Sequence, residues 1–254
     1  MTNPPIPEDL MSRARSLQLH GLVSHWEEIK SEPWVPALID WEEVARQKRS
    51  LERRIKAARV GRFRPMAQFD WSWPKVCDRM AIESLAHLDF IRDKDNVILL
   101  GPNGVGKTMI AKNLIHSAVM QGYTARYITA AELLGDLAAV KSDALLKRRL
   151  KGYARFDVIC VDEIGYLSYG DRHADLLFEL INRCYEEKSI IVTSNRPFSE
   201  WKEVFPNAGC VVTLVDRLVH HAEVIRLEGD SYRLRDANER KAQRKRKSKE
   251  ARAE

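Results

Sequence analysis

The segment Gly-Pro-Asn-Gly-Val-Gly-Lys-Thr, residues 101–108, constrains the fold more than any other part of this sequence of 254 residues. It matches the pattern G-x-x-x-x-G-K-[ST] at every fixed position. Gly101, Gly104 and Gly106 allow the backbone to curl so that its N–H groups point at phosphate oxygens. Such a loop needs a strand before it and a helix after it, because the positive helix N-terminus adds to the attraction for phosphate. The sequence therefore predicts an α/β core with a phosphate-binding loop.

The side chains at the end of this loop predict the kind of ligand. Lys107 supplies a point charge for the β- and γ-phosphates, and Thr108 offers a hydroxyl to a Mg²⁺ ion that bridges them. The alternative is a glycine turn with a chance lysine. The expected nucleotide-binding residues are Gly101, Pro102, Asn103, Gly104, Val105, Gly106, Lys107, Thr108 and Met109.

Hydrophobic patterning around the loop alternates between strand and helix. Such alternation is typical of a parallel sheet with helices on both faces. Strands are expected over 96–100, 125–128, 157–161 and 189–193, and helices over 109–121, 130–140 and 173–187.

Asp162 and Glu163 follow the apolar segment 158–161. Asp162 can hold the metal through its waters, and Glu163 can orient or polarise an attacking water. Nucleotide kinases with the same loop need no water-activating glutamate here, so the pair favours hydrolysis over transfer of a phosphoryl group to a metabolite. A small-molecule kinase remains the weaker alternative. Because no N-K-x-D guanine-reading motif is present, ATP is favoured over GTP.

Three further polar residues are candidates for the same site. Asn195 follows the strand 190–194, where parallel sheets bind ligands, and it could reach the γ-phosphate or the attacking water. Its alternative role is to cap the turn before Pro197. Arg217 and Arg233 are ordinary arginines by spacing alone, for which surface ion pairs are the default.

The net charge of +6 is concentrated at the two ends of the chain. Residues 1–65 carry 12 basic and 9 acidic side chains, residues 66–236 carry 22 and 24, and residues 237–254 carry 8 and 3. This distribution suggests that a polyanion such as DNA is bound from the ends. We expect a basic helical domain over 1–65 that binds DNA or mediates assembly, a core over 66–236 and a disordered basic tail over 237–254. The tail's alternative is a merely solvated segment.

A helix is expected from Trp41 to about Arg59. Val44, Leu51, Ile55 and Ala58 form its apolar stripe. At about 100° per residue, a row of cations lies on the opposite face and could contact the DNA backbone, although a solvated face without a ligand stays open. These cations are Arg46, Arg49, Arg53 and Lys56.

The sequence contains no apolar run near the roughly 18 residues of a membrane-spanning helix. Its first residues, MTNPPIPEDL, lack the basic-then-apolar plan of a secretory signal. We expect a cytoplasmic protein that does not engage a membrane.

Taken together, these motifs resemble those of the IstB-type ATPases, the helper proteins of bacterial insertion sequences, which are themselves similar to DnaC-type helicase loaders. The resemblance covers nearly the whole chain. It implies an AAA+ P-loop ATPase core preceded by a small helical domain. It rests on Phe69-Asp70-Trp71, the phosphate loop, 161–166, 193–195, Asp216-Arg217-Leu218 and the segment 229–234.

The resemblance also implies roles for the arginines and for partners. Arg217 becomes an arginine finger for a neighbouring subunit, Arg233 a second sensor in its own subunit and Asn195 the first sensor. The implied protein uses ATP and Mg²⁺, forms homo-oligomers on double-stranded DNA, deforms it and directs the cognate transposase there, and hydrolysis releases the assembly. The alternative is a helicase loader acting on a helicase ring and single-stranded DNA. The implied catalytic set is Lys107, Asp162, Glu163, Asn195, Arg217 and Arg233.

Overall fold

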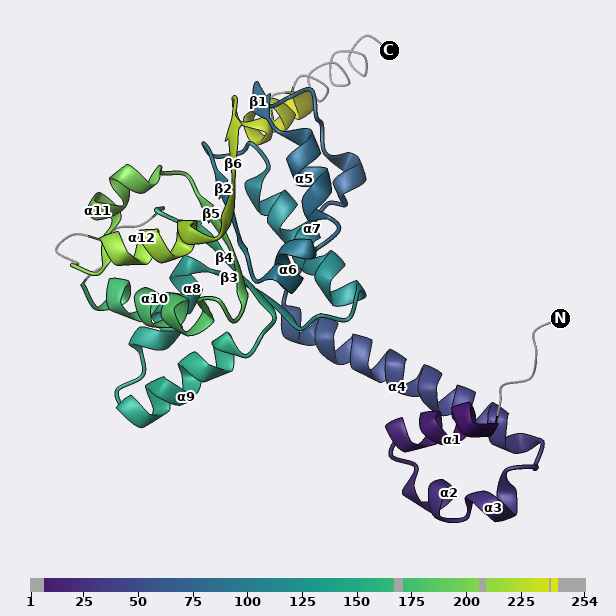
Figure 1. Ribbon diagram of the computed structural model, residues 1–254. Coiled ribbons are helices and arrows are strands. Elements are labelled where there is room, and N and C mark those ends of the chain that lie inside the picture. Colours follow the sequence, from purple (N-terminus) through teal and green to yellow (C-terminus); the bar gives the residue numbers. More distant parts are fainter. Residues whose placement is uncertain (1–6, 167–170, 206–208, 238, 242–254) are drawn as a thin grey trace, which may run out of the picture. The chain divides into compact units, whose positions relative to one another are not determined.

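The computed structural model describes residues 7–166, 171–205, 209–237 and 239–241, in two compact units (Figure 1). The first unit ends at Arg53 and the second begins at Arg54, inside one long helix, whereas the sequence placed a boundary after residue 65. The helix end belongs to the second unit because Arg126 donates a hydrogen bond to the carbonyl oxygen of Ala57 at 3.0 Å. Of the basic tail predicted over 237–254, residues 238 and 242–254 lie outside the described residues. No helix in the described ranges has the length and apolar character needed to cross a membrane.

The first unit is helical. It contains α1 (Pro7–Ser16), α2 (His20–Ser24), α3 (Trp26–Ile29) and the first part of α4 (Trp34–Ala58). Arg13 on α1 is ion-paired with Asp40 at 2.5 Å and with Glu43 at 2.7 Å, which ties α1 to α4. Its small core consists of Leu10, Ala14, Leu17, Trp26, Val35 and Ile39.

The apolar stripe predicted for α4 is largely exposed, which corrects that expectation. Val44 is 65% exposed and Ile55 is 50% exposed, while Ala58 is buried. The helix begins at Trp34 rather than Trp41, and its buried side chains in the first unit are those of Val35 and Ile39. At about 100° per residue, Val44 lies half a turn away from Val35, so it points away from this core.

The second unit is built on a six-stranded sheet in the order β1-β6-β2-β5-β4-β3 (Figure 1). The neighbours from β6 to β3 are parallel, and the short β1 pairs antiparallel with β6. All residues of β2 are buried, as expected for a strand that is covered on both faces. The strands are β1 (Val76–Cys77), β2 (Asn96–Leu100), β3 (Ala125–Thr129), β4 (Val158–Ile164), β5 (Ser189–Ser194) and β6 (Ala222–Glu228).

Helices cover both faces of this sheet, which confirms the expected α/β class (Figure 1). One face packs against α8 (Ala130–Ala138), α9 (Asp143–Ala154), α10 (Asp171–Cys184) and α12 (Val211–His220). The other carries α5 (Arg79–Leu85), α6 (Asp89–Asp93) and α7 (Lys107–Met120). Shorter helices are η1 (Met66–Gln68), η2 (Phe198–Glu200) and α11 (Trp201–Val204).

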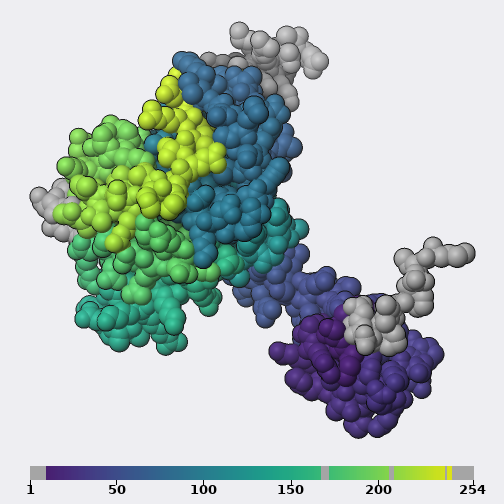
Figure 2. All heavy atoms as spheres, viewed as in Figure 1, coloured from purple at the N-terminus to yellow at the C-terminus, as the bar shows by residue number. Residues whose placement is uncertain are grey.

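The strand order places the functional residues at one edge. The chain leaves β2 for β3 on one side, and β6 pairs with β2 on the other, so β2 is the topological switch point of the sheet. The carboxyl ends of β2, β4 and β5 lie at the same edge because these strands are parallel. The yellow atoms of β6 lie beside the blue atoms around β1, so the first and the last strand of the sheet meet near that edge (Figure 2).

Candidate nucleotide site

The phosphate loop connects β2 to α7 and requires glycine at positions where other atoms approach closely. A Cβ atom at Gly101 would lie 2.0 Å from the carbonyl oxygen of Leu227 on β6. Gly106 adopts a φ of +107°, and a Cβ atom there would lie 2.4 Å from the ring of Phe69. The loop is therefore fixed between β6 and the segment that precedes the sheet.

Lys107 opens α7 and is buried, with only 5% of its surface exposed. Its Nζ donates hydrogen bonds to the carbonyl oxygens of Gly101 at 2.6 Å and Pro102 at 2.8 Å. Burial lowers the pKa of Lys107 to about 8; Asp162 opposes this shift and Arg233 adds to it. The charged form thus lacks sufficient negative partners, and a triphosphate at the loop would provide them.

Asp162, at the end of β4, collects hydrogen bonds from three elements and is buried. It accepts one from Thr108 Oγ1 on α7 at 3.0 Å, one from Tyr127 on β3 at 2.5 Å and one from Thr193 on β5. Burial, together with the neighbouring carboxylate, raises the pKa of Tyr127, so this hydroxyl remains a donor. Hydroxyl and carboxylate oxygens side by side are the donor set that Mg²⁺ prefers, so Thr108 and Asp162 fit this ion.

Glu163 lies in a β-bulge. The register between β4 and β5 shifts between Val161 and Ile164, and Glu163 has a φ of +66°. Its N–H donates to Thr193 Oγ1 at 2.9 Å. Such a backbone costs on the order of 1–3 kcal/mol for a residue other than glycine, and bulges of this kind re-aim side chains at active sites. Burial and then the charge of Asp162 raise the pKa of Glu163, which makes it a stronger proton acceptor.

Asn195 directly follows β5, and its Oδ1 atom is buried without a hydrogen-bond partner among the described residues. A Cβ atom at Gly165, after β4, would lie 3.1 Å from this oxygen. The ends of β4 and β5 therefore meet at Asn195. A buried acceptor without a donor is costly, so this oxygen fits a ligand or water that donates to it.

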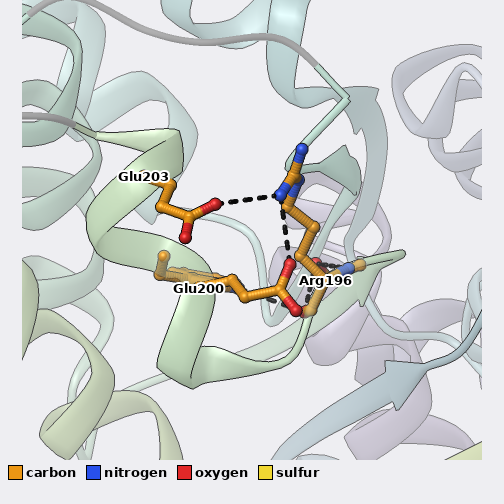
Figure 3. Close-up of polar contacts among 5 residues, drawn as sticks. Arg196, Glu200 and Glu203 are labelled. Atoms are coloured by element: carbon orange, nitrogen blue, oxygen red, sulfur yellow. Dashed lines mark hydrogen bonds and ion pairs between the residues drawn. The ribbon is translucent and has the colours of Figure 1, made fainter.

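Hydrogen bonds of Arg196 stabilise the turn after Asn195. Its side chain donates to Glu200 at 3.1 Å and to Glu203 at 3.3 Å, as Figure 3 shows. Its backbone N–H donates to Ser194 Oγ at 3.1 Å, and Ser194 Oγ donates to its carbonyl oxygen at 2.9 Å. These bonds limit the freedom of the backbone on which Asn195 sits.

A cavity of about 370 Å³ opens beside the loop and is lined by Gly104 to Met109, Phe69, Trp73, Tyr232 and Arg233, among others. Its wall is held together by segments far apart in sequence. Trp73 Nε1 donates to the carbonyl oxygen of Asp230 at 2.8 Å, and the N–H of Tyr232 donates to the carbonyl oxygen of Gly104 at 3.0 Å. Arg233 also lines this cavity.

Phe69, Trp73 and Tyr232 form an aromatic wall of this cavity, to which the sequence assigned no role. Phe69 belongs to a segment that the resemblance singled out, but its contact with Gly106 depends on how the chain before the sheet folds back. Tyr127 and Thr193 were missed as partners of Asp162. Each lies in a strand that pairs directly with β4, so only the strand order reveals them as partners.

The structure does not place Arg217 in the wall of this cavity. It lies on α12 and donates to the side-chain oxygen of Asn182 on α10. Its guanidinium stands 5.2 Å from the ring centre of Phe178 and 5.6 Å from that of Tyr185. Within the described residues it has no carboxylate partner, so the default of a surface ion pair does not apply.

The cations predicted to contact DNA are on α4, and two of them are partly neutralised. Arg46 pairs with Glu42 at 2.6 Å, and Arg49 pairs with the same carboxylate at 3.1 Å. Arg53 and Lys56 are exposed.

Comparison with known proteins identifies the family. The family model described as IstB-like ATP binding protein matches residues 12–241. The chain belongs to this family. It is 39% identical over 191 residues to the ATP-binding protein of insertion sequence IS21 from Pseudomonas aeruginosa, covering 75% of this chain and 72% of the relative. It is 35% identical to that of IS5376 from Geobacillus stearothermophilus, covering 78% and 79%. The expected identity, an IstB-family ATPase, is confirmed.

Solved structures show the same fold at low sequence identity. DnaI has a TM-score of 0.53 at 16% identity, covering 66% of this chain and 89% of that one. The DnaC helicase loader has a TM-score of 0.50 at 16% identity, covering 69% and 98%. DnaA bound to AMPPCP and single-stranded DNA has a TM-score of 0.52 at 18% identity, covering 64% and 52%. The AAA+ P-loop fold of the IstB-family chain is confirmed.

Replacing Gly106 tests the geometry of the loop. Gly106→Ala should weaken ATP binding by about tenfold or more, because the added methyl group meets Phe69 and an L side chain is strained at this φ. Gly135→Ala is the matched control, since a Cβ atom at Gly135 on α8 meets nothing within 4 Å. Titration of both variants with a fluorescent ATP analogue measures the effect. Unchanged affinity in Gly106→Ala would contradict the loop geometry.

Proposed function

We propose that this IstB-family protein is the ATP-dependent transposition helper of an insertion sequence. With ATP bound, copies of the chain assemble on duplex DNA, deform it and direct the cognate transposase to that site. Hydrolysis of ATP releases the assembly. The observation that carries this proposal is the junction of the phosphate loop with Asp162 and Glu163, in a chain whose relatives are insertion-sequence proteins.

The residues at this junction have different roles in ATP binding and hydrolysis. Lys107 and the loop N–H groups bind the phosphates, and Thr108 with Asp162 would hold Mg²⁺, which neutralises charge on the β- and γ-phosphates when bound. Glu163 accepts a proton from the attacking water and orients it. The burial that raises the pKa of Glu163 supports this role.

Asn195 and the two arginines respond to the γ-phosphate. The Oδ1 of Asn195, which has no partner among the described residues, accepts a hydrogen bond from the attacking water. Arg233, in the wall of the cavity, contacts the nucleotide in its own subunit. Arg217, held on α12 outside this cavity, serves a neighbouring subunit as the arginine finger. Contacts to the γ-phosphate from two subunits would make their association depend on ATP.

The DNA contacts are assigned to Arg46, Arg49, Arg53 and Lys56 on α4, whose charge favours the phosphate backbone. A helicase loader is the alternative function. The likeness to DnaI and DnaC supports only a shared fold, because it lies at 16% identity, whereas the insertion-sequence relatives reach 39%. Preference for single strands and capture of a replicative helicase, in place of transposase recruitment to duplex DNA, would favour the loader.

Removing the proton acceptor should separate assembly from release. Glu163→Gln should bind ATP and assemble on duplex DNA, while its turnover falls by at least about 100-fold, because general-base catalysis contributes roughly 10²–10⁴-fold. Phosphate release and the lifetime of nucleoprotein particles are the measurements. Glu187→Gln, at an exposed carboxylate in the turn between α10 and β5, is the matched control. Wild-type turnover in Glu163→Gln would remove Glu163 from the catalytic site.

Mixing two inactive variants tests whether Arg217 acts across subunits. Arg217→Ala retains the loop and should bind ATP, but it lacks the finger. Lys107→Ala should lose ATP binding but keeps Arg217 to offer to a neighbour. Each alone should show little hydrolysis on DNA, and a mixture should recover a measurable part of the wild-type rate. Failure of every mixing ratio to recover activity, with both variants folded, would contradict action in trans.

A further inference from the structure

Three side chains that can bind a metal ion lie together at the edge of the sheet opposite the phosphate loop. They are Glu186, His220 and His221, and their ligand atoms all lie within 4.8 Å of one another. Glu186 lies in the turn before β5, and the two histidines lie at the end of α12, directly before β6. Because β5 and β6 are both parallel to β2, their amino ends share the edge away from the loop.

The ligand types of this cluster favour Zn²⁺ over the Mg²⁺ of the nucleotide site. Two imidazole nitrogens and one carboxylate are a set that zinc takes in sites with three protein ligands and one open position. Mg²⁺ prefers oxygen ligands. With Zn–N distances of about 2.0–2.1 Å, two ligand atoms of a tetrahedral zinc ion lie about 3.4 Å apart. The three side chains are exposed, so they can rotate from the observed spacing to this one.

The backbone that carries these ligands is fixed to the core of the second unit. The N–H of Asn96 on β2 donates to the carbonyl oxygen of His221 at 2.7 Å. After α10, the N–H of Lys188 donates to the carbonyl oxygen of Cys184 at 2.8 Å. The helices α10 and α12 pack against each other on one face of the sheet (Figure 1). The ligands are thus held near one another before an ion binds, which reduces the entropy that binding costs.

Glu186 occupies a backbone conformation that favours glycine. Its φ is +59°, in the left-handed region, two residues after the end of α10. Glycine is the usual residue at such a position after a helix, because it has no side chain to strain the turn. A glycine here would relieve that strain but would remove the carboxylate. A ligand role gives the glutamate a function at this position.

Tyr185 orients the ring of His220. The tyrosine hydroxyl oxygen lies 2.8 Å from Nδ1 of His220. In the tautomer whose Nδ1–H donates to this oxygen, the lone pair of the ring is on Nε2, where it can bind an ion. Burial, then the charge of Glu186 and a hydrogen bond to it, raises the pKa of Tyr185, so the hydroxyl keeps its proton. Histidines that bind metals are commonly oriented by such a bond at their other nitrogen.

The cluster lies one helical turn from Arg217. Arg217 and His221 are four residues apart at the end of α12, and the guanidinium stands 5.6 Å from the ring centre of Tyr185. The charges of Glu186 and Asp216 oppose that of Arg217 around this tyrosine. An ion bound here would therefore fix both the end of α12 and the ring against which Arg217 lies.

We propose that Glu186, His220 and His221 bind one Zn²⁺ ion that clamps the end of α10 to the end of α12. A water completes the tetrahedral coordination. The site does not depend on the proposed function, because its ligands do not line the nucleotide cavity. Under that function, the ion limits the movement of Arg217, the arginine offered to a neighbouring subunit.

Zn²⁺ binding by the full chain tests the carboxylate ligand. Isothermal titration calorimetry is carried out without nucleotide and with Mg²⁺ in excess, so that Mg²⁺ fills sites made of oxygen ligands. Loss of a residue that only orients a ligand costs about 10–100-fold in metal affinity, and loss of a ligand should cost at least as much. Glu186→Gln should therefore weaken Zn²⁺ binding by more than about tenfold. Glu187→Gln, at the adjacent exposed carboxylate, is the matched control and should bind as the wild type does.

Thermal unfolding tests the two histidines. Zn²⁺ should raise the Tm of the wild type, because an ion that binds the folded chain stabilises it. The double variant with His220→Ala and His221→Ala should lose this rise. The matched control replaces His20 and His25, two exposed histidines of the first unit, by alanine and should keep it. If the His220 and His221 variant does not fold, the comparison of the two glutamine variants decides alone.

Tyr185→Phe tests the positioning role, since it keeps every ligand and should still weaken Zn²⁺ binding by about 10–100-fold. Equal affinities in Glu186→Gln and Glu187→Gln would overturn the inference. A rise in Tm that persists without His220 and His221, or Zn²⁺ binding by the wild type without any rise, would overturn it too. These results would leave the proposed function intact, whereas a wild type that does not bind ATP would refute that function and leave the zinc site standing.

Discussion

The hydrogen bonds to the buried carboxylate of Asp162 hold the second unit together around its site. A carboxylate out of water is tolerated only when hydrogen bonds satisfy it, and here the donors come from α7, β3 and β5. Because these donors lie on three elements, the carboxylate can be satisfied only if the strands and the loop helix are assembled in their observed order. The same bonds place Thr108 beside Asp162, so the contacts that stabilise the fold also form the proposed Mg²⁺ site.

A second constraint follows at the next residue. The bulge turns the Glu163 side chain away from the face that regular strand alternation would give it. The N–H of Glu163 donates to the hydroxyl of Thr193, which itself donates to Asp162. Asn195 follows the neighbouring strand β5, and its Oδ1 atom has no hydrogen-bond partner among the described residues. Strain in the backbone and an unsatisfied oxygen are both destabilising in isolation. Their coincidence beside the phosphate loop is consistent with a site prepared for a nucleotide and a water.

Much of this arrangement could be predicted from the sequence, because it depends on short-range chemistry. The loop, Asp162, Glu163 and Asn195 each follow a recognisable apolar strand, and parallel strands bring their carboxyl ends together. The partners of Asp162 could not be predicted, since Tyr127 and Thr193 are ordinary strand residues until the strand order is known. The aromatic wall depends on β1, which is two residues long and pairs with β6, a strand far from it in the sequence. On α4 the periodicity was real, but it did not say which stripe faces the core: Val35 and Ile39 are buried, while Val44 is exposed.

In the proposed function, the γ-phosphate, bound by the loop of one subunit and sensed by the next, decides whether copies of this chain stay together on DNA. The most direct test is the size of the nucleoprotein particles that the wild-type protein forms on linear duplex DNA, measured by electron microscopy or light scattering with ATP, with ADP and without nucleotide. We expect large, regular particles with ATP and their loss in the other two conditions. Particles of the same size and abundance in all three would contradict it.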